Sequence, residues 1–193
     1  MNTLSKARTP KYFRELQDLT QELGFSMSSD MGMQFLLQSL CASKPSGIFL
    51  ELGTGTGLSL VHMLQGMDMD SRILSLDNDP QLIERVSQTL SNERRLELLC
   101  ADGGKWIEDY EGEGFDLIFA DAWPGKYSQL DKTLQMVKKG GFYVIDDLLP
   151  QPSWPEGHDA KAEALVAELE TRNDFAITTM EWSTGILIAT KIN

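Results

Sequence analysis

The fold class of this chain is indicated by the segment Ile48-Phe-Leu-Glu-Leu-Gly-Thr-Gly-Thr-Gly-Leu-Ser-Leu60. Its first five residues form an apolar run with the length of a buried strand, and glycines follow at Gly53, Gly55 and Gly57. A helical spacing of apolar residues then resumes. A strand, a glycine turn and a helix in this order bring bare backbone and a helix N-terminus close to a ligand. The segment therefore predicts a site for a nucleotide-type cofactor.

The glycine spacing separates two kinds of cofactor. A dinucleotide fingerprint requires Gly-x-Gly-x-x-Gly or Ala. Counting from Gly53 places Leu58 at the third position, and counting from Gly55 places Leu60 there. An NAD-dependent oxidoreductase is therefore disfavoured. The acidic residue inside the strand, Glu51, suits a cofactor that carries positive charge.

Composition narrows the class of protein. The chain has 193 residues, 41% of them hydrophobic and 24% charged, which is ordinary for one globular domain. Its formal charge of −12 disfavours nucleic acid and anionic membrane surfaces as partners, because both require a basic face. No signal-peptide core and no run of 18 apolar residues occurs, so we expect a cytoplasmic protein. Cys41 and Cys100 lie in apolar runs and are expected to be buried free thiols.

Strand and helix patterns alternate through most of the chain. This alternation predicts an α/β fold with a doubly wound, mostly parallel sheet and helices on both faces. The last two strands, separated by a turn at 181–185, are expected to form an antiparallel hairpin. The expected strands are 48–52, 72–77, 96–100, 115–121, 142–147, 175–182 and 186–192. The expected helices between them begin near Gly57, Pro80, Gly103 and Ser128, and a last one spans about 159–171.

Two further helices are expected before the first strand. One lies within residues 11–23, and the second follows Met27-Ser28-Ser29-Asp30 with a serine as its N-cap. Residues 1–46 would form a helical cap on the core at 47–193, within one domain. The run Lys138-Lys-Gly-Gly141 is interpreted as a helix end, with cations near the C-terminus.

Acidic residues follow the predicted parallel strands. Ligands of open α/β sheets bind beyond the carboxyl ends of the strands. Asp77 could accept hydrogen bonds from two ribose hydroxyls, whereas Asp79 precedes Pro80 as a helix cap. Asp102 could bind an adenine amino group or cap the next helix.

Three more carboxylates stand at the ends of the fourth and fifth strands, at Asp121, Asp146 and Asp147. Left unpaired, they would repel one another. A hard cation such as Mg²⁺ or Ca²⁺ would relieve that repulsion, because such ions prefer oxygen ligands. The alternative is that Asp121 binds backbone amides and Asp147 faces solvent.

The pattern Glu51-x-Gly53-x-Gly55-x-Gly57 resembles the first motif of class I methyltransferases, which bind S-adenosylmethionine (SAM) on a seven-stranded sheet. Phe115 to Tyr127 and Gly141 to Pro150 resemble the small O-methyltransferases, such as the catechol and caffeoyl-CoA enzymes. The similarity covers about residues 25–150. It implies cofactor contacts at Met27, Ser28, Glu51, Gly53, Thr54, Gly55, Gly57, Ser59, Asp77, Asn78, Asp102, Gly103, Asp121 and Trp123.

The resemblance also implies a metal site, but this chain differs from those enzymes at one metal ligand and at the catalytic lysine. The metal-binding aspartate and Asp-Asn pair of those enzymes correspond to Asp121 and to Asp146-Asp147, so an aspartate replaces the asparagine. The catechol enzyme carries a lysine base three residues after its first metal aspartate, where this chain has Pro124. The catalytic set is therefore predicted as Asp121 with Lys126, Tyr127 and His158 as candidate bases. Trp123 and Trp154 would form apolar walls.

The sequence thus predicts a SAM-dependent methyltransferase that methylates oxygen on a small-molecule acceptor, assisted by a divalent metal. Two alternatives stay open: a metal-independent methyltransferase for another acceptor, including nitrogen, and a non-catalytic protein that binds SAM or a nucleoside. The two N-terminal helices could cover the site or pair with a second copy in a homodimer.

Overall fold

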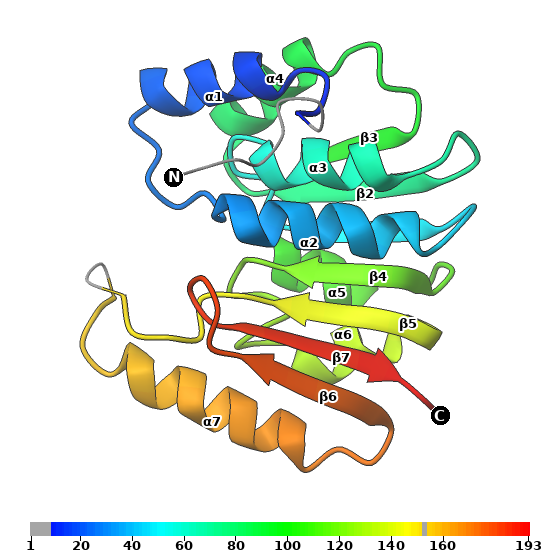
Figure 1. The fold of residues 1–193 in the computed structure, drawn as a ribbon, viewed down its shortest axis with the longest axis vertical. Helices are drawn as coiled ribbons and strands as arrows, with labels where there is room; N and C mark the ends of the chain where they lie inside the picture. The colour runs from blue at the N-terminus through cyan, green and yellow to red at the C-terminus, as the bar shows by residue number, and fades with distance from the viewer. Residues whose placement is uncertain (1–8, 152–153) are drawn as a thin grey trace.

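The chain folds around a single seven-stranded sheet (Figure 1). We describe it from a computed structural model that covers residues 9–151 and 154–193. Residues 1–8 of the expected cap and residues 152–153, which precede Trp154, lie outside the described residues. The strands are β1 (Ile48–Leu52), β2 (Arg72–Asp77), β3 (Leu96–Cys100), β4 (Phe115–Ala120), β5 (Val137–Ile145), β6 (Phe175–Met180) and β7 (Ile186–Lys191).

The strand order is β3-β2-β1-β4-β5-β7-β6. Strands β1 to β5 are parallel, and β7 pairs antiparallel with both β5 and β6. The predicted doubly wound sheet with an antiparallel C-terminal hairpin is therefore confirmed. The order reverses at β1 and β4, and a ligand crevice is expected beyond their carboxyl ends.

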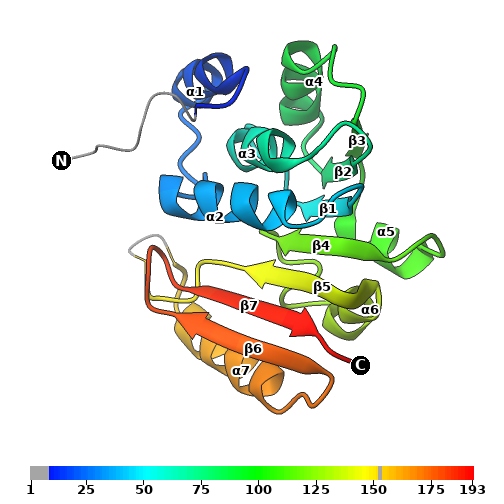
Figure 2. The same ribbon diagram turned by 45° about the vertical axis from the view of Figure 1, so that its right-hand side comes forward.

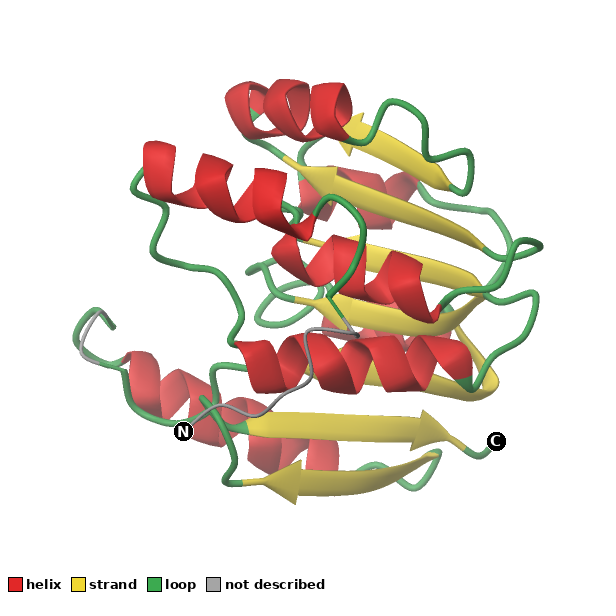
Figure 3. Cartoon of the chain, turned by 45° about the horizontal axis from the view of Figure 1, so that its top comes forward, coloured by secondary structure: helices red, strands yellow, loops and turns green. Residues whose placement is uncertain are grey.

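Helices cover both faces of the sheet, as Figures 2 and 3 show. One hydrophobic core forms beneath the first four helices, and a second forms beneath the last three. The helices are α1 (Phe13–Glu22), α2 (Met31–Ala42), α3 (Leu58–Gly66), α4 (Pro80–Thr89), α5 (Gly103–Asp109), α6 (Leu130–Gln135) and α7 (His158–Glu170). Because both faces are buried, the strands of the sheet centre are almost entirely apolar.

The two N-terminal helices belong to the first core. Leu16 of α1 and Met33 of α2 are fully buried there. The N-cap of α2 is Asp30, whose carboxylate accepts a hydrogen bond from the Met33 amide. The predicted serine cap is therefore wrong by one or two residues, since a carboxylate at this position satisfies the free amide.

Two other local predictions are also wrong. The Lys138-Lys-Gly-Gly141 run lies inside β5, because α6 already ends at Gln135 and the pairing of β5 with β4 is irregular at this point. Gly140 there adopts a φ of 76°, which glycine allows without steric strain. Of the two free cysteines, Cys41 is buried as expected, but Cys100 at the end of edge strand β3 is exposed.

Within the ranges that the structure covers, no helix has both the length and the apolar character needed to span a membrane.

Candidate functional site

A cavity of about 620 Å³ lies beyond the carboxyl ends of β1, β2 and β4. Its floor is the glycine turn between β1 and α3, and the 23–29 linker between α1 and α2 borders it on another side. All predicted cofactor contacts except Glu51 line this cavity. They are Met27, Ser28, Gly53, Thr54, Gly55, Gly57, Ser59, Asp77, Asn78, Asp102, Gly103, Asp121 and Trp123.

The glycine turn requires glycine at specific points. Gly53 has a φ of 101°, and a Cβ there would lie 3.0 Å from the backbone oxygen of Asp121. Gly55 has a φ of 52°, and its Cβ would lie 3.2 Å from the ring of Phe25. Because the left-handed region is unfavourable for side chains and the space is filled, the turn packs closely against the β4 end and the linker.

Glu51 lies behind the turn instead of facing the cavity. Its side chain points to the sheet face covered by the first core, since it shares that face with Phe49. The fully buried carboxylate accepts hydrogen bonds of 2.6 Å from the hydroxyls of Ser59 and Ser75. Ser75 is also hydrogen-bonded to Thr54 at 2.7 Å. Glu51 therefore holds the turn and the start of α3 in place, and its predicted direct contact with the cofactor is not supported by its position.

The burial of Glu51 predicts a pH dependence of stability. Burial raises the pKa of Glu51 from 4.5 to about 7. The hydrogen bonds from the two serine hydroxyls lower this pKa, but their effect is smaller than that of burial. Because the folded state holds the proton more tightly than the unfolded state, the free energy of unfolding should fall as the pH rises between these values. The pKa difference corresponds to a loss on the order of 3 kcal/mol.

This dependence is measured by urea unfolding of wild type and Glu51→Gln between about pH 5 and about pH 8. The decline should be smaller in Glu51→Gln than in wild type by on the order of 3 kcal/mol, whereas the exposed control Glu181→Gln should keep the wild-type decline. Equal slopes in wild type and Glu51→Gln would show that Glu51 is ionised throughout.

Asp77 and Asp102 both line the cavity and both also serve the backbone. Asp77 accepts hydrogen bonds from the amides of Gly55 and Asp79, one on each carboxylate oxygen. Asp102 caps α5 by accepting a hydrogen bond from the Lys105 amide. Asp79 caps α4, as its position before Pro80 predicts. Asp102 therefore serves as the N-cap of α5, and its contact with the adenine of the cofactor stays a prediction.

The linker between α1 and α2 contributes the predicted Met27 and Ser28 together with two residues that were not predicted, Phe25 and Ser29. Phe25 packs against Gly55, and the Ser29 hydroxyl lies 3.2 Å from a carboxylate oxygen of Asp121. The hydroxyl oxygen of Ser28 is buried, with no hydrogen-bond partner among the described residues. Met27, in contrast, is 74% exposed. The linker has no spacing motif around Phe25 and Ser29, so only its place in the fold reveals the contacts of these two residues.

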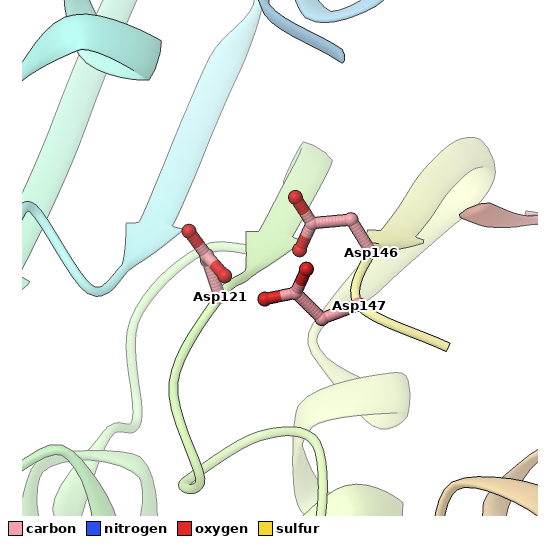
Figure 4. Close-up of side chains that lie close together, drawn as sticks. All are labelled: Asp121, Asp146 and Asp147. Atoms are coloured by element: carbon pink, nitrogen blue, oxygen red, sulfur yellow. The ribbon is translucent and has the colours of Figure 1, made fainter. Parts of the chain in front are cut away.

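The three predicted metal-binding carboxylates converge beside this cavity (Figure 4). Asp121 follows β4, and Asp146 and Asp147 follow β5; one oxygen from each lies within 4.8 Å of the others. Asp146 is 1% exposed, and its Oδ1 has no hydrogen-bond partner among the described residues. Burial raises the pKa values of Asp121 and Asp146, and the negative charge of their carboxylate neighbours raises them further. Such a group of oxygens is unfavourable without a cation.

The three candidate bases lie together on the other side of Trp123. The Tyr127 hydroxyl is 3.2 Å from Nε2 of His158. Burial lowers the pKa of His158, while burial and the nearby Asp147 and Asp146 raise the pKa of Tyr127 to about 12. Lys126 is buried and donates a hydrogen bond of 2.6 Å to the backbone oxygen of Asp146. None of the three lines the cofactor cavity.

Aromatic rings surround this group. The ring of Trp154 packs on His158 with centroids 4.5 Å apart, and Trp123 packs on both Tyr127 and His158. Trp123 is half exposed and also lines a second cavity of about 590 Å³ that reaches α7. The predicted apolar walls therefore lie together, next to the acidic cluster.

Comparison with known proteins agrees with this geometry. Caffeoyl-CoA O-methyltransferase 2 from Populus trichocarpa is 31% identical over 156 residues, which cover 74% of this chain and 62% of that protein. A matching protein of Mycobacterium leprae is 31% identical over 78 residues, 38% of this chain, and the chain spans only 35% of its length. The crystal structure of O-methyltransferase TomG from Streptomyces achromogenes shares the fold with a TM-score of 0.82, at 18% identity, covering 95% of this chain and 90% of that one.

The sequence model of one family, described as O-methyltransferase, matches residues 3–192. Because this match spans nearly the whole sequence, the chain belongs to the O-methyltransferase family.

Proposed function

We propose that this protein is a SAM-dependent methyltransferase that methylates an oxygen of a small-molecule acceptor. The observation that carries the proposal is the meeting of two features at one sheet edge: a cavity built on a glycine turn and a cluster of three carboxylates beside it. Membership of the O-methyltransferase family supports it. TomG, which shares the fold, is described as being in complex with SAM.

The cavity has groups suited to SAM. The bare backbone of Gly53 and Gly55 leaves room for the cofactor, and Asp77 keeps lone pairs free for ribose hydroxyls because each of its oxygens accepts one hydrogen bond. The buried hydroxyl of Ser28 has no hydrogen-bond partner in the part of the chain that the structure describes, and it could bind the cofactor. Trp123 offers an apolar surface at the side of Asp121, where the cofactor and acceptor would meet.

The acidic cluster has the properties of a divalent-metal site. Its three ligands are carboxylates, which Mg²⁺ and Ca²⁺ prefer. Oδ1 of Asp146 is buried and has no hydrogen-bond partner among the described residues, so the chemistry of the three carboxylates suits a bound cation. Asp121, Asp146 and Asp147 would hold the ion. When bound, it would lower the pKa of an acceptor hydroxyl and help to orient it.

The residues around the site would divide the work of methyl transfer. SAM supplies a methyl group activated on sulfur. The acceptor oxygen would take up this methyl group as its bond to sulfur breaks, and the acceptor hydroxyl would lose its proton. Trp123 and Trp154 would hold the acceptor in line, which is where most of the rate enhancement arises. We assign the removal of the proton to Tyr127 and His158, because their hydrogen bond can pass it to a neutral imidazole.

The first experiment is thermal unfolding with S-adenosylhomocysteine and, separately, with NADH. A ligand at 100 times its dissociation constant should stabilise the folded state by about 2.7 kcal/mol. The expected result is a shift with S-adenosylhomocysteine alone, because the glycine spacing does not suit a dinucleotide. A shift with NADH alone would refute the methyltransferase proposal.

Turnover then separates the remaining alternatives. Methylation of catechol-type acceptors that EDTA abolishes and Mg²⁺ restores is the expected outcome. Turnover that is insensitive to EDTA would favour the metal-independent enzyme, including one that methylates nitrogen. Binding of the cofactor without turnover on any screened acceptor would favour the non-catalytic alternative. Pro124, which replaces the lysine base of the catechol enzyme, would be consistent with that result.

A further inference from the structure

We propose that Lys126 is a positioning residue of the acidic cluster: it balances one of the three carboxylate charges and fixes the backbone that presents Asp146 and Asp147. This inference deepens the proposed function and relies on the proposed metal site. Lys126 lies in the turn that follows β4, two residues after position 124, where the resemblance to the catechol enzyme would place a lysine. Three observations on its burial, its charge and its hydrogen bond carry the proposal.

The first observation is the burial of the ammonium group. Lys126 is 5% exposed, and it takes part in none of the ion pairs found in the described residues. Its Nζ donates to a neutral acceptor, the backbone oxygen of Asp146, at 2.6 Å. A buried cation is unfavourable unless nearby negative charge compensates it. The carboxylates at the ends of β4 and β5 are the negative charges that this position offers.

The second observation is the balance of charge. The Nζ of Lys126 lies 2.6 Å from the backbone oxygen of Asp146, and one carboxylate oxygen of Asp146 lies within 4.8 Å of oxygens of Asp121 and Asp147. Around a bound metal ion, three carboxylates and one ammonium would together carry a net charge of two negative units. This equals the charge of one divalent cation, whereas three carboxylates alone would exceed it. Lys126 therefore allows a third aspartate where an uncharged side chain would otherwise be needed.

The third observation concerns the peptide group that joins Asp146 to Asp147. Its carbonyl oxygen accepts the hydrogen bond from Lys126, and its N–H donates to the Thr184 hydroxyl at 3.2 Å. The plane of this peptide is therefore held from both sides. Asp147 adopts a φ of 52°, so the chain turns sharply here and needs such support. Because the two carboxylates extend from either end of this peptide, its orientation determines how their oxygens converge.

The test is a double-mutant cycle on the metal-free protein in EDTA, with thermal unfolding as the measurement. Lys126→Met removes the charge and keeps the length of the side chain. Asp147→Asn removes one carboxylate, and asparagine tolerates the left-handed backbone conformation at this position. Lys126→Met should lower the Tm by roughly 10 °C in the wild-type background. It should lower the Tm less than half as much in the Asp147→Asn background, because less negative charge remains to be balanced.

Lys132→Met is the matched control. Lys132 lies in the same connection before β5, and its ammonium pairs with Glu111 on the surface. Its effect on the Tm should be small and equal in both backgrounds. Equal losses for Lys126→Met in the two backgrounds would overturn the proposal, since a packing role alone does not depend on Asp147. If Lys126→Met does not fold, the double variant decides: folding supports the proposal and failure to fold overturns it.

The cycle is independent of metal binding. A Mg²⁺ titration of the wild-type protein, followed by calorimetry, tests the metal site itself. Coupling between Lys126 and Asp147 without any binding of Mg²⁺ would refute the proposed metal site, but it would still support the charge-balancing role of Lys126. Binding of Mg²⁺ without coupling would refute the role of Lys126 alone.

Discussion

Gly53→Ala is expected to weaken the binding of S-adenosylhomocysteine by about 100-fold or more. Gly53 has a φ of 101°, a conformation that alanine adopts only with strain of roughly 1–3 kcal/mol. The added Cβ would also lie 3.0 Å from the backbone oxygen of Asp121, and backbone atoms cannot rotate away. The turn and the end of β4 must therefore move apart, and both line the cofactor cavity. A change of about 2.7 kcal/mol in binding free energy corresponds to 100-fold in affinity.

Gly140→Ala separates the effect of the cavity from the effect of backbone strain. Gly140 also has a positive φ, of 76°, but a Cβ there meets nothing within 4 Å. It lies in β5, away from the residues that line the cavity. Calorimetric titration should show that Gly140→Ala loses some stability and keeps its affinity for S-adenosylhomocysteine. Wild-type affinity in Gly53→Ala would mean that the cofactor does not bind over this turn.

Asp146→Asn is expected to have opposite effects on metal binding and on stability. It removes a charged oxygen ligand, so the affinity for Mg²⁺ should fall by about 100-fold, and turnover should fall with it. In EDTA, the free energy of unfolding should rise by about 1–2 kcal/mol, because burial disfavours the ionised carboxylate more than the charge of Lys126 stabilises it, and asparagine is neutral. A functional site commonly lowers stability in this way.

The control for this substitution is Asp70→Asn, which removes the same charge from an exposed position between α3 and β2. Mg²⁺ affinity is measured by calorimetry and stability by urea unfolding in EDTA. Asp70→Asn should change neither quantity by a measurable amount. Unchanged Mg²⁺ affinity in Asp146→Asn, together with lower stability in EDTA, would show that Asp146 has a structural role and that the metal lies elsewhere.

The order of strands and helices could be predicted from the sequence because the pattern is local. Apolar runs of five or six residues separated by helical periodicity specify a parallel sheet whether or not the distant contacts are known. The glycine turn after β1 follows from its spacing alone. The convergence of Asp121 with Asp146 and Asp147 was also predictable, because parallel strands place their carboxyl ends at the same edge of a sheet.

The prediction was least accurate where local signals competed. Two lysines before two glycines are typical of a helix end, yet in this chain the same residues form an irregular part of β5. Cys100 lies in an apolar run, but β3 is an edge strand, and its last residue is exposed. Whether a strand lies at the centre or at the edge of a sheet depends on the order of the strands, which no local pattern contains.

The sequence by itself therefore determined the α/β architecture, the glycine turn and the set of carboxylates at the strand ends. Only the tertiary structure decided which way each side chain faces and which distant group it meets. Glu51 turns away from the cavity to bind Ser75, 24 residues away, and Ser29 reaches Asp121 across 92 residues. Lys126 meets the Asp146 carbonyl in the same way. Such contacts arise from the packing of separate elements, so periodicity and spacing along the chain carry no record of them.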